Sequence, residues 1–178
     1  MFQDIFGVLA NPQANAALHA LATEHAIARA EQIDRVAGLD SRGFLFANSM
    51  ALAIGKPFVP VRKAGKLPGC CVGRSYQLEY GEDRLEVQAD SIRPGDRILL
   101  VDGNTDPTQF SPKWSKCVVL SCADLLATGG TLATACTLVR QCGATVDHCW
   151  VVIELSALKG RERVGEKVES LVNMENIM

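Results

Sequence analysis

The clearest chemical signal in the sequence is a glycine-rich segment that runs into a helical pattern, Asp124-Leu-Leu-Ala-Thr-Gly-Gly-Thr131. Adjacent glycines let backbone N–H groups turn toward one point, and the start of a helix adds partial positive charge. Thr128 and Thr131 supply hydroxyl donors on both sides of the glycines. The segment therefore predicts a cradle for a phosphate monoester, and the alternative is a glycine-rich turn that only caps a helix.

Basic side chains on two other segments could serve a second anionic group. Arg42 follows one expected strand, and Arg62, Lys63 and Lys66 lie at the end of the next. The carboxyl ends of parallel strands meet at one edge of a sheet, so these cations are expected to gather there. Cations in such a position stabilise negative charge that develops on a leaving group. The alternative is an ordinary solvated polar loop.

The elements that must position these residues alternate between strand and helix patterns. Asn11 and Pro12 predict the start of a helix in which Leu18, Leu21, His25 and Ala28 recur at helical spacing. Two further helices are expected at 43–54 and 129–142. Buried strands are expected at 35–39, 58–61, 85–87, 98–101, 146–155 and 168–172. This order predicts an α/β fold, a mostly parallel sheet flanked by helices, with residues 1–178 as a single domain.

Composition narrows the class of protein. Of the 178 residues, 48% are hydrophobic and 21% are charged, as in ordinary globular domains. The net charge of −2, without a long basic run, disfavours a nucleic-acid surface. No apolar stretch is long enough to span a bilayer, and Asp4 interrupts any signal-peptide pattern. The seven cysteines form no paired C-x-x-C clusters, which favours reduced thiols in the cytoplasm over zinc ligands.

The glycine-rich segment resembles the phosphoribosyl-pyrophosphate loop of the type I phosphoribosyltransferases. Four more segments are similar to the adenine-specific branch of that family: GLDSRGFLF at 38–46, VRKAGKLPG at 61–69, SYQLEYG at 75–81 and ELSALKGR at 154–161. The resemblance implies purine salvage, in which phosphoribosyl pyrophosphate and adenine give AMP and pyrophosphate. It also implies a cytoplasmic homodimer, and Mg²⁺ bound through the phosphoribosyl pyrophosphate and not by direct protein ligands.

The resemblance assigns expected roles to residues of this sequence. Asp124 would be catalytic through the ribose hydroxyls. The 5′-phosphate would be bound by Ala127, Thr128, Gly129, Gly130 and Thr131, and the pyrophosphate by Ser41, Arg42, Arg62, Lys63 and Lys66.

A mobile lid is implied for residues 65–81, closing to keep water from the activated sugar. Glu79 within it would be catalytic by hydrogen-bonding or protonating the imidazole edge of the purine. Phe2 and Leu155 would sandwich the adenine ring, with Gln3 beside it.

Two departures from the family pattern affect the expected activity. The match begins almost at Met1, where the family normally has a further helical segment that helps cover the base. In the family, Val-Asp-Asp-Leu-Leu-Ala-Thr-Gly-Gly-Thr is unbroken, whereas here residues 103–123 separate Asp102 from Asp124. Deleting these 21 residues restores the motif, which suggests a retained intron; the alternative is an evolved insert.

The insert leaves the strand that feeds the phosphate loop undecided between residues 97–102 and 117–122. We expect the first, because the turn at Pro94, Gly95 and Asp96 delivers it at the family's spacing. Impaired activity is expected for this form of the chain. The alternatives are a non-catalytic isoform that binds nucleotide or pairs with other subunits, and a phosphoribosyltransferase for another purine.

Overall fold

The computed structural model describes residues 5–78, 81–102, 125–126 and 128–175. Its strands are β1 (Arg35–Leu39), β2 (Phe58–Lys63), β3 (Cys71–Leu78), β4 (Gly81–Gln88), β5 (Arg97–Val101), β6 (Leu125–Leu126), β7 (Thr145–Leu155) and β8 (Val168–Met174). Its α-helices are α1 (Phe6–Leu9), α2 (Pro12–Ile27), α3 (Gly43–Ile54), α4 (Gly130–Gln141) and α5 (Gly160–Val164), with 3-10 turns η1 (Ala30–Gln32) and η4 (Ser156–Leu158).

One sheet joins all of these strands. The order is β3-β4-β2-β1-β5-β7-β6, and β8 also pairs with β7. Strands β2, β1, β5, β7, β6 and β8 are mutually parallel where they pair, whereas β3 and β4 form an antiparallel hairpin that attaches to β2. The expected mostly parallel sheet is therefore confirmed, with an antiparallel extension at one end.

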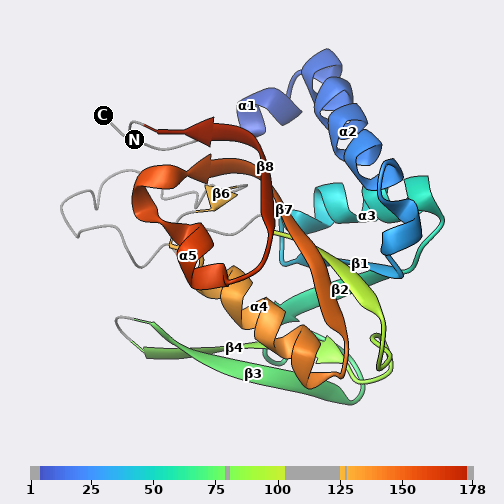
Figure 1. Cartoon of the computed structure of the whole chain (residues 1–178), viewed down its shortest axis with the longest axis vertical. Coiled ribbons are helices and arrows are strands. Elements are labelled where there is room, and N and C mark those ends of the chain that lie inside the picture. Colours follow the sequence, from blue (N-terminus) through green and yellow to red (C-terminus); the bar gives the residue numbers. More distant parts are fainter. Residues whose placement is uncertain (1–4, 79–80, 103–124, 127, 176–178) are drawn as a thin grey trace.

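Helices cover both faces of the sheet: α2 and α3 lie on one side and α4 on the other (Figure 1). Side chains alternate between the two faces along each central strand. In β5, Ile98 and Leu100 join the core beneath α4, whereas Leu99 and Val101 join the core beneath α2 and α3. Burial on both faces explains why β1, β5 and β7 are continuous apolar runs instead of alternating ones.

Local signals set the helix boundaries as expected. The side chain of Asn11 accepts hydrogen bonds from the backbone N–H groups of Gln13 and Ala14, each at 3.0 Å, and so caps α2. Helix α3 ends at Gly55, which takes the left-handed conformation with φ 63°. Gly143 follows α4 with φ 80°. The expected helices over 11–28, 43–54 and 129–142 are therefore confirmed to within a residue or two at their ends.

The structure differs from expectation in three places. Residues 71–78, expected to be a polar loop, form β3, and β4 extends well beyond the expected strand at 85–87. The short helices α1 and α5 were not anticipated. The buried face of α2 is formed by Leu18, Ala22 and Ala26, whereas Leu21 is 47% exposed. No helix in the described ranges is both long and apolar enough to cross a membrane.

Candidate functional site

The phosphate-loop residues that the structure describes stand at the start of α4. Gly129 is the N-cap residue in the left-handed conformation, with φ 75°, and Gly130 is the first helical residue. No side chain caps this helix, so its first N–H groups are presented without a capping acceptor. Thr131 lies in the first turn and is buried, whereas Thr128 is half-buried. This geometry suits an anion at the helix start, as expected.

Glycine is required at position 129 for two separate reasons. Its positive φ is costly for any residue with a Cβ. In addition, a Cβ placed there would overlap the carbonyl oxygen of Gly160 and lie 3.1 Å from Cγ2 of Val164. The loop is therefore packed directly against α5, an element that carries no role in the expected chemistry.

A second cluster forms where β1 and β2 end. Because Leu39 and Val61 are paired, Asp40 and Arg62 emerge side by side. Nε of Arg62 donates to Oδ2 of Asp40 at 2.9 Å, and Nζ of Lys66 lies 3.9 Å from the same oxygen. Ser41 follows Asp40 through a cis peptide bond. All five expected pyrophosphate residues thus lie at or just beyond the ends of β1 and β2: Ser41, Arg42, Arg62, Lys63 and Lys66.

Arg42 and Lys63 have partners other than Asp40. Arg42 is buried, with Cζ 6.0 Å from the centroid of the Phe6 ring. Lys63 pairs with Oδ2 of Asp83 on β4 at 2.5 Å, so the structure directs it toward the hairpin. Burial on its own would raise the pKa of Asp83, but hydrogen bonds from Lys63 and the Arg84 backbone outweigh it and lower that pKa.

The expected lid is largely the hairpin of β3 and β4. Their pairing runs from Cys71 opposite Gln88 to Leu78 opposite Gly81. Tyr76 donates its hydroxyl hydrogen to Asp83 at 3.3 Å, which links the two strands through side chains. Glu79 lies between the paired ends of this hairpin and outside the described residues.

Leu155, which the sequence predicts to contact the base, lies at the carboxyl end of β7. Leu155 is the last residue of β7, is 8% exposed, and packs against Ile153 and Met174. Glu154 beside it is buried and accepts two hydrogen bonds from Arg161, at 2.6 and 2.7 Å. These bonds lower the pKa of Glu154. Phe2 and Gln3, the other expected adenine-binding residues, lie outside the described residues.

The insert separates Asp102 from Asp124, yet the strands before and after it, β5 and β6, pair with β7 along one continuous line. Val101 pairs with Trp150, and Leu125 pairs with Ile153. Because β8 occupies the opposite edge of β7, β5 and β6 lie on the same edge, one after the other. Val101 and Leu125 are 24 residues apart in sequence, whereas their partners on β7 are three residues apart. The chain between them is therefore 21 residues longer than a continuous strand would need.

Removing residues 103–123 would therefore leave Val101, Asp102, Asp124 and Leu125 at consecutive register positions. Asp102 is buried at the end of β5, and its backbone N–H donates to the carbonyl oxygen of Trp150 at 3.2 Å. Strand β5 keeps its place between β1 and β7, as expected. Asp124, Ala127 and the alternative strand at 117–122 lie outside the described residues.

Sequence reasoning assigned no role to three residues at this end of the sheet, Asp40, Glu154 and Arg161. Asp40, which holds Arg62, was inside a quoted motif but received no role, although its place directly after a buried strand was a usable signal. Glu154 and Arg161 were likewise quoted without a role. Their pairing joins positions seven residues apart across a turn and carries no sequence periodicity.

Comparisons with known proteins agree with this geometry. No family model matches the chain. The adenine phosphoribosyltransferase of Stochomys longicaudatus is 43% identical over 166 residues, covering 93% of this chain and 81% of that protein. That of Acidiphilium cryptum is 43% identical over 149 residues, covering 84% of this chain and 75% of the relative.

Solved structures give the same answer. The adenine phosphoribosyltransferase of Rhodothermus marinus superimposes with a TM-score of 0.78 at 35% identity, covering 98% of this chain and 87% of that one. The Saccharomyces cerevisiae enzyme, solved with an imino-altritol bisphosphate and adenine, gives 0.74 at 38% identity, covering 96% and 86%. Sequence and structure together show that the chain belongs to the adenine phosphoribosyltransferase family.

Proposed function

We propose that this chain transfers the phosphoribosyl group of phosphoribosyl pyrophosphate to adenine, yielding AMP and pyrophosphate. The observation that carries the proposal is that the α4 phosphate loop and the Asp40–Arg62–Lys66 cluster both follow the carboxyl ends of parallel strands, β6 for the loop and β1 and β2 for the cluster. A loop for a monoester and a cationic cluster for a second phosphate group match the two charged ends of this substrate.

In the proposed reaction, the bond between ribose C1 and the pyrophosphate oxygen breaks, and a bond from C1 to purine N9 forms. The electron pair leaves with pyrophosphate, and the N9 proton of adenine is released. The N–H groups at the start of α4 would hold the 5′-phosphate, while Arg62 and Lys66 would stabilise charge on the leaving group. Leu155 would contact one face of the base, opposite Phe2. Glu79 would hydrogen-bond the purine, and Asp102 and Asp124 the ribose hydroxyls.

A Mg²⁺ ion held by the substrate fits the described donor set. The described residues contain no group of three His, Cys, Asp or Glu side chains able to hold a metal ion. Carboxylates are the ligand type that Mg²⁺ prefers, and the described Asp40 carboxylate is engaged by Arg62. When bound, the ion would neutralise pyrophosphate charge.

The direct test is AMP formation from phosphoribosyl pyrophosphate and each purine, with saturating Mg²⁺, in the chain without residues 103–123, for which activity is predicted. We expect turnover with adenine and none with hypoxanthine, which distinguishes this function from that of a phosphoribosyltransferase for another purine. Turnover with hypoxanthine alone would contradict the proposal. The products should be AMP and pyrophosphate in equal amounts.

A second candidate function rests on the 21 surplus residues at the end of β5. They interrupt the pair of acidic residues, so this form could bind nucleotide or pair with other subunits without catalysing transfer. Binding of AMP without turnover would support that reading. A messenger sequence that lacks the codons for 103–123 would support the retained-intron explanation.

We also propose that residues 1–178 form a single domain and that the protein is a cytoplasmic homodimer. The apolar side chains of Leu45 and Leu52 on α3 support the dimer, because they are 42% and 74% exposed on a helix otherwise packed onto the sheet. Light scattering of the purified chain tests the stoichiometry. A Leu52→Glu variant is expected to be monomeric if this face is the contact.

A further inference from the structure

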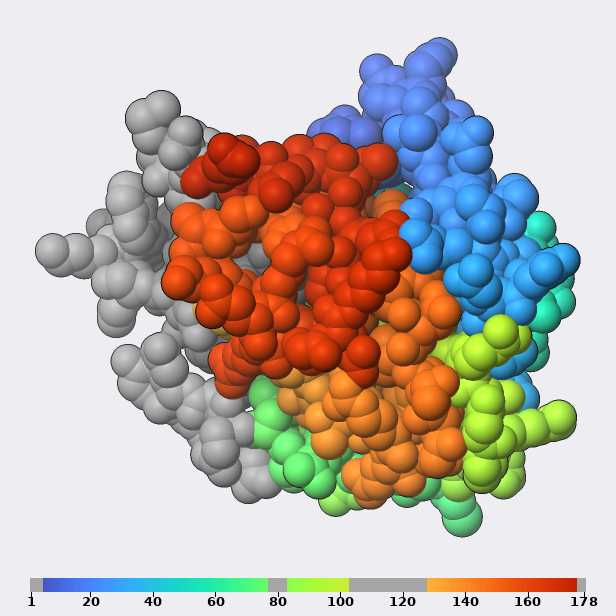
Figure 2. Space-filling view, viewed as in Figure 1, coloured from blue at the N-terminus to red at the C-terminus, as the bar shows by residue number. Residues whose placement is uncertain are grey.

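Arg163, near the end of α5, lies against the first residue of the phosphate-loop helix. A Cβ placed on Gly130 would lie 3.3 Å from both Cζ and Nη1 of Arg163, and 3.5 Å from Nη2. The guanidinium therefore stands beside the helix start, where the backbone N–H groups of the proposed 5′-phosphate site are presented. Figure 2 shows the surface of the β7–β8 region, in orange and red, continuing into that of α4.

The placement of this cation is electrostatically unfavourable without an anion. The start of a helix carries partial positive charge, so a guanidinium there is opposed by the helix dipole. The other basic side chains of α4, of α5 and of the residues that flank α5 have carboxylate partners: Arg140 pairs with Glu166, Lys159 with Glu162, Arg161 with Glu154, and Lys167 with Glu169. Within the described ranges, no carboxylate pairs with Arg163. Arg163 is exposed, so its guanidinium is open to an anion that approaches the helix start from solvent.

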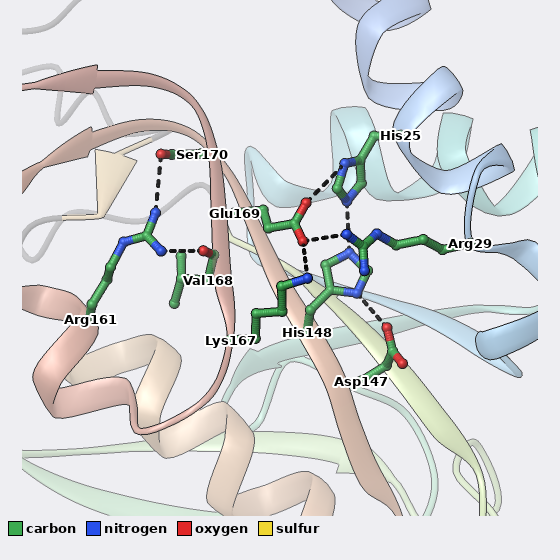
Figure 3. A network of polar contacts seen from close by, with 9 residues as sticks. All are labelled: His25, Arg29, Asp147, His148, Arg161, Lys167, Val168, Glu169 and Ser170. Carbon is green, nitrogen blue, oxygen red and sulfur yellow. Dashed lines mark hydrogen bonds and ion pairs between the residues drawn. The ribbon is translucent and has the colours of Figure 1, made fainter.

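The helix that carries Arg163 is held firmly in position. Arg161, two residues earlier, makes a two-point contact with buried Glu154 through Nε and Nη2. Its Nη1 donates to the Val168 carbonyl, and Nη2 also donates to the Ser170 hydroxyl (Figure 3). On its other side, α5 presses the Gly160 carbonyl against Gly129. Arg163 is thus fixed relative to the loop by contacts that do not depend on its own side chain.

We propose that Arg163 is a substrate-binding residue that donates hydrogen bonds to the 5′-phosphate of phosphoribosyl pyrophosphate and of AMP. This inference rests on the proposed function. The backbone N–H groups of the loop surround the phosphate on one side, and the guanidinium closes the side toward α5. A charged donor adds long-range attraction that neutral N–H groups lack, so it acts on phosphate-bearing ligands and not on the free base.

The test compares Arg163→Gln with Arg140→Gln, the same substitution at the far end of α4. Calorimetry would measure the dissociation constants of AMP and of adenosine. Kinetics of the same substitutions in the chain without residues 103–123 would give the KM for phosphoribosyl pyrophosphate. For Arg163→Gln we expect KM and the AMP dissociation constant to rise about tenfold or more, the loss typical of one charge-assisted hydrogen bond. Adenosine binding should not change. Arg163→Lys should recover part of the loss, and Arg140→Gln should stay within about twofold of the parent chain.

The outcomes separate this inference from the proposed function. If the parent chain binds AMP and Arg163→Gln binds it equally well, the inference is wrong and the function stands. If both substitutions weaken AMP equally, the effect is one of general charge, and the inference is again wrong. If the parent chain binds neither AMP nor phosphoribosyl pyrophosphate, the proposed function fails, and the inference fails with it.

Discussion

At the scale of single residues, Glu79 and Asp124 are expected to carry the chemistry. We predict that Glu79→Gln and Asp124→Asn each lower turnover by about a hundredfold or more, the range typical of positioned acid–base groups, with little change in stability. Both should be made in a chain without residues 103–123, where the acidic pair is contiguous. Steady-state kinetics and thermal unfolding measure the two effects. Normal turnover in both variants would remove these residues from the mechanism.

Gly129 gives a second test, and the chain supplies its own control. Gly129→Ala meets both a positive φ and the Gly160 carbonyl, whereas Gly165→Ala meets a positive φ of 66° with no atom within 4 Å of the new Cβ. We expect both to lose about 1 kcal/mol of stability from the backbone conformation. Only Gly129→Ala should also raise the KM for phosphoribosyl pyrophosphate. A similar rise in Gly165→Ala would argue against the packing explanation.

A histidine pair beneath α2 predicts how acid affects the fold. Nε2 of His25 lies 2.7 Å from Nε2 of His148, and Nδ1 of His148 lies 2.6 Å from an Asp147 oxygen (Figure 3). Burial, aided by nearby His148 and opposed by Glu169, lowers the pKa of His25 from 6.5 to about 4. Burial also lowers the pKa of His148, against the hydrogen bond to Asp147.

These lowered pKa values destabilise the fold in mild acid. Between pH 6.5 and 4 the unfolded chain binds protons that folded His25 does not, so stability falls as the pH falls through this window. From pH 7 to 5 we expect the parent chain to lose about 1 kcal/mol more than His25→Gln, after allowance for partial exposure of the ring. Denaturant unfolding at several pH values measures this. Above pH 7 the two curves should run parallel, and parallel curves below pH 7 would contradict the prediction.

At the scale of elements, strong periodicity and capping residues made most of the fold predictable. Strands β1, β5 and β7 are apolar runs because both of their faces are buried, and α2 and α3 begin or end at Asn11 and Gly55. Strand β3 was missed because its exposed polar residues, Arg74 and Ser75, and its Gly73 resemble a loop in sequence. Helix α5 has five residues, too few to show a period.

The same distinction applies to the site. The phosphate loop and the cations at the ends of β1 and β2 could be predicted because each follows directly from its own element. The contacts of α5 with the loop could not, because they depend on how Arg161 packs on Glu154. Such pairings depend on tertiary structure, and no local sequence pattern indicates them.

Strand β5 offers a test of the choice between the two possible feeding strands. Its residues pair on both edges, with β1 and with β7. We expect the amides at 98–101 to be among the slowest to exchange with deuterium, because opening them requires breaking the centre of the sheet. Peptide-level exchange followed by mass spectrometry measures this. Fast exchange at 98–101 together with protection at 117–122 would show that the other strand feeds the loop.

At the scale of the whole molecule, the fold accommodates the insert more easily than the chemistry does. Closing a loop of this length costs on the order of 3 kcal/mol plus a constant in conformational entropy. This cost is smaller than the free energy of unfolding typical of a domain, about 5–15 kcal/mol. The register supports this view, because β5 and β6 keep the positions that an uninterrupted strand would occupy. A displacement of about 1 Å at reacting groups can nevertheless cost on the order of a hundredfold in rate.

We therefore predict that the 178-residue chain has little or no transferase activity and that deleting residues 103–123 increases it. In the deleted chain, Asp102 and Asp124 would follow one another at the strand end and present their carboxylates to the ribose together. With the insert, 21 residues separate Asp124 from Asp102, so the end of β5 no longer fixes the position of Asp124. AMP formation by the two chains, at saturating Mg²⁺ and both substrates, measures the difference.

The comparison needs a control for the adenine pocket, in which Leu155 is proposed to contact the base. Both chains should be assayed over a range of adenine concentrations, because a poorly formed pocket would depress activity with or without the insert. The deletion should raise kcat, while a change in the pocket alone would raise the KM for adenine. Equal AMP formation by the intact and deleted chains at saturating adenine would show that residues 103–123 are a tolerated surface loop, and that Asp124 reaches its position without a contiguous strand.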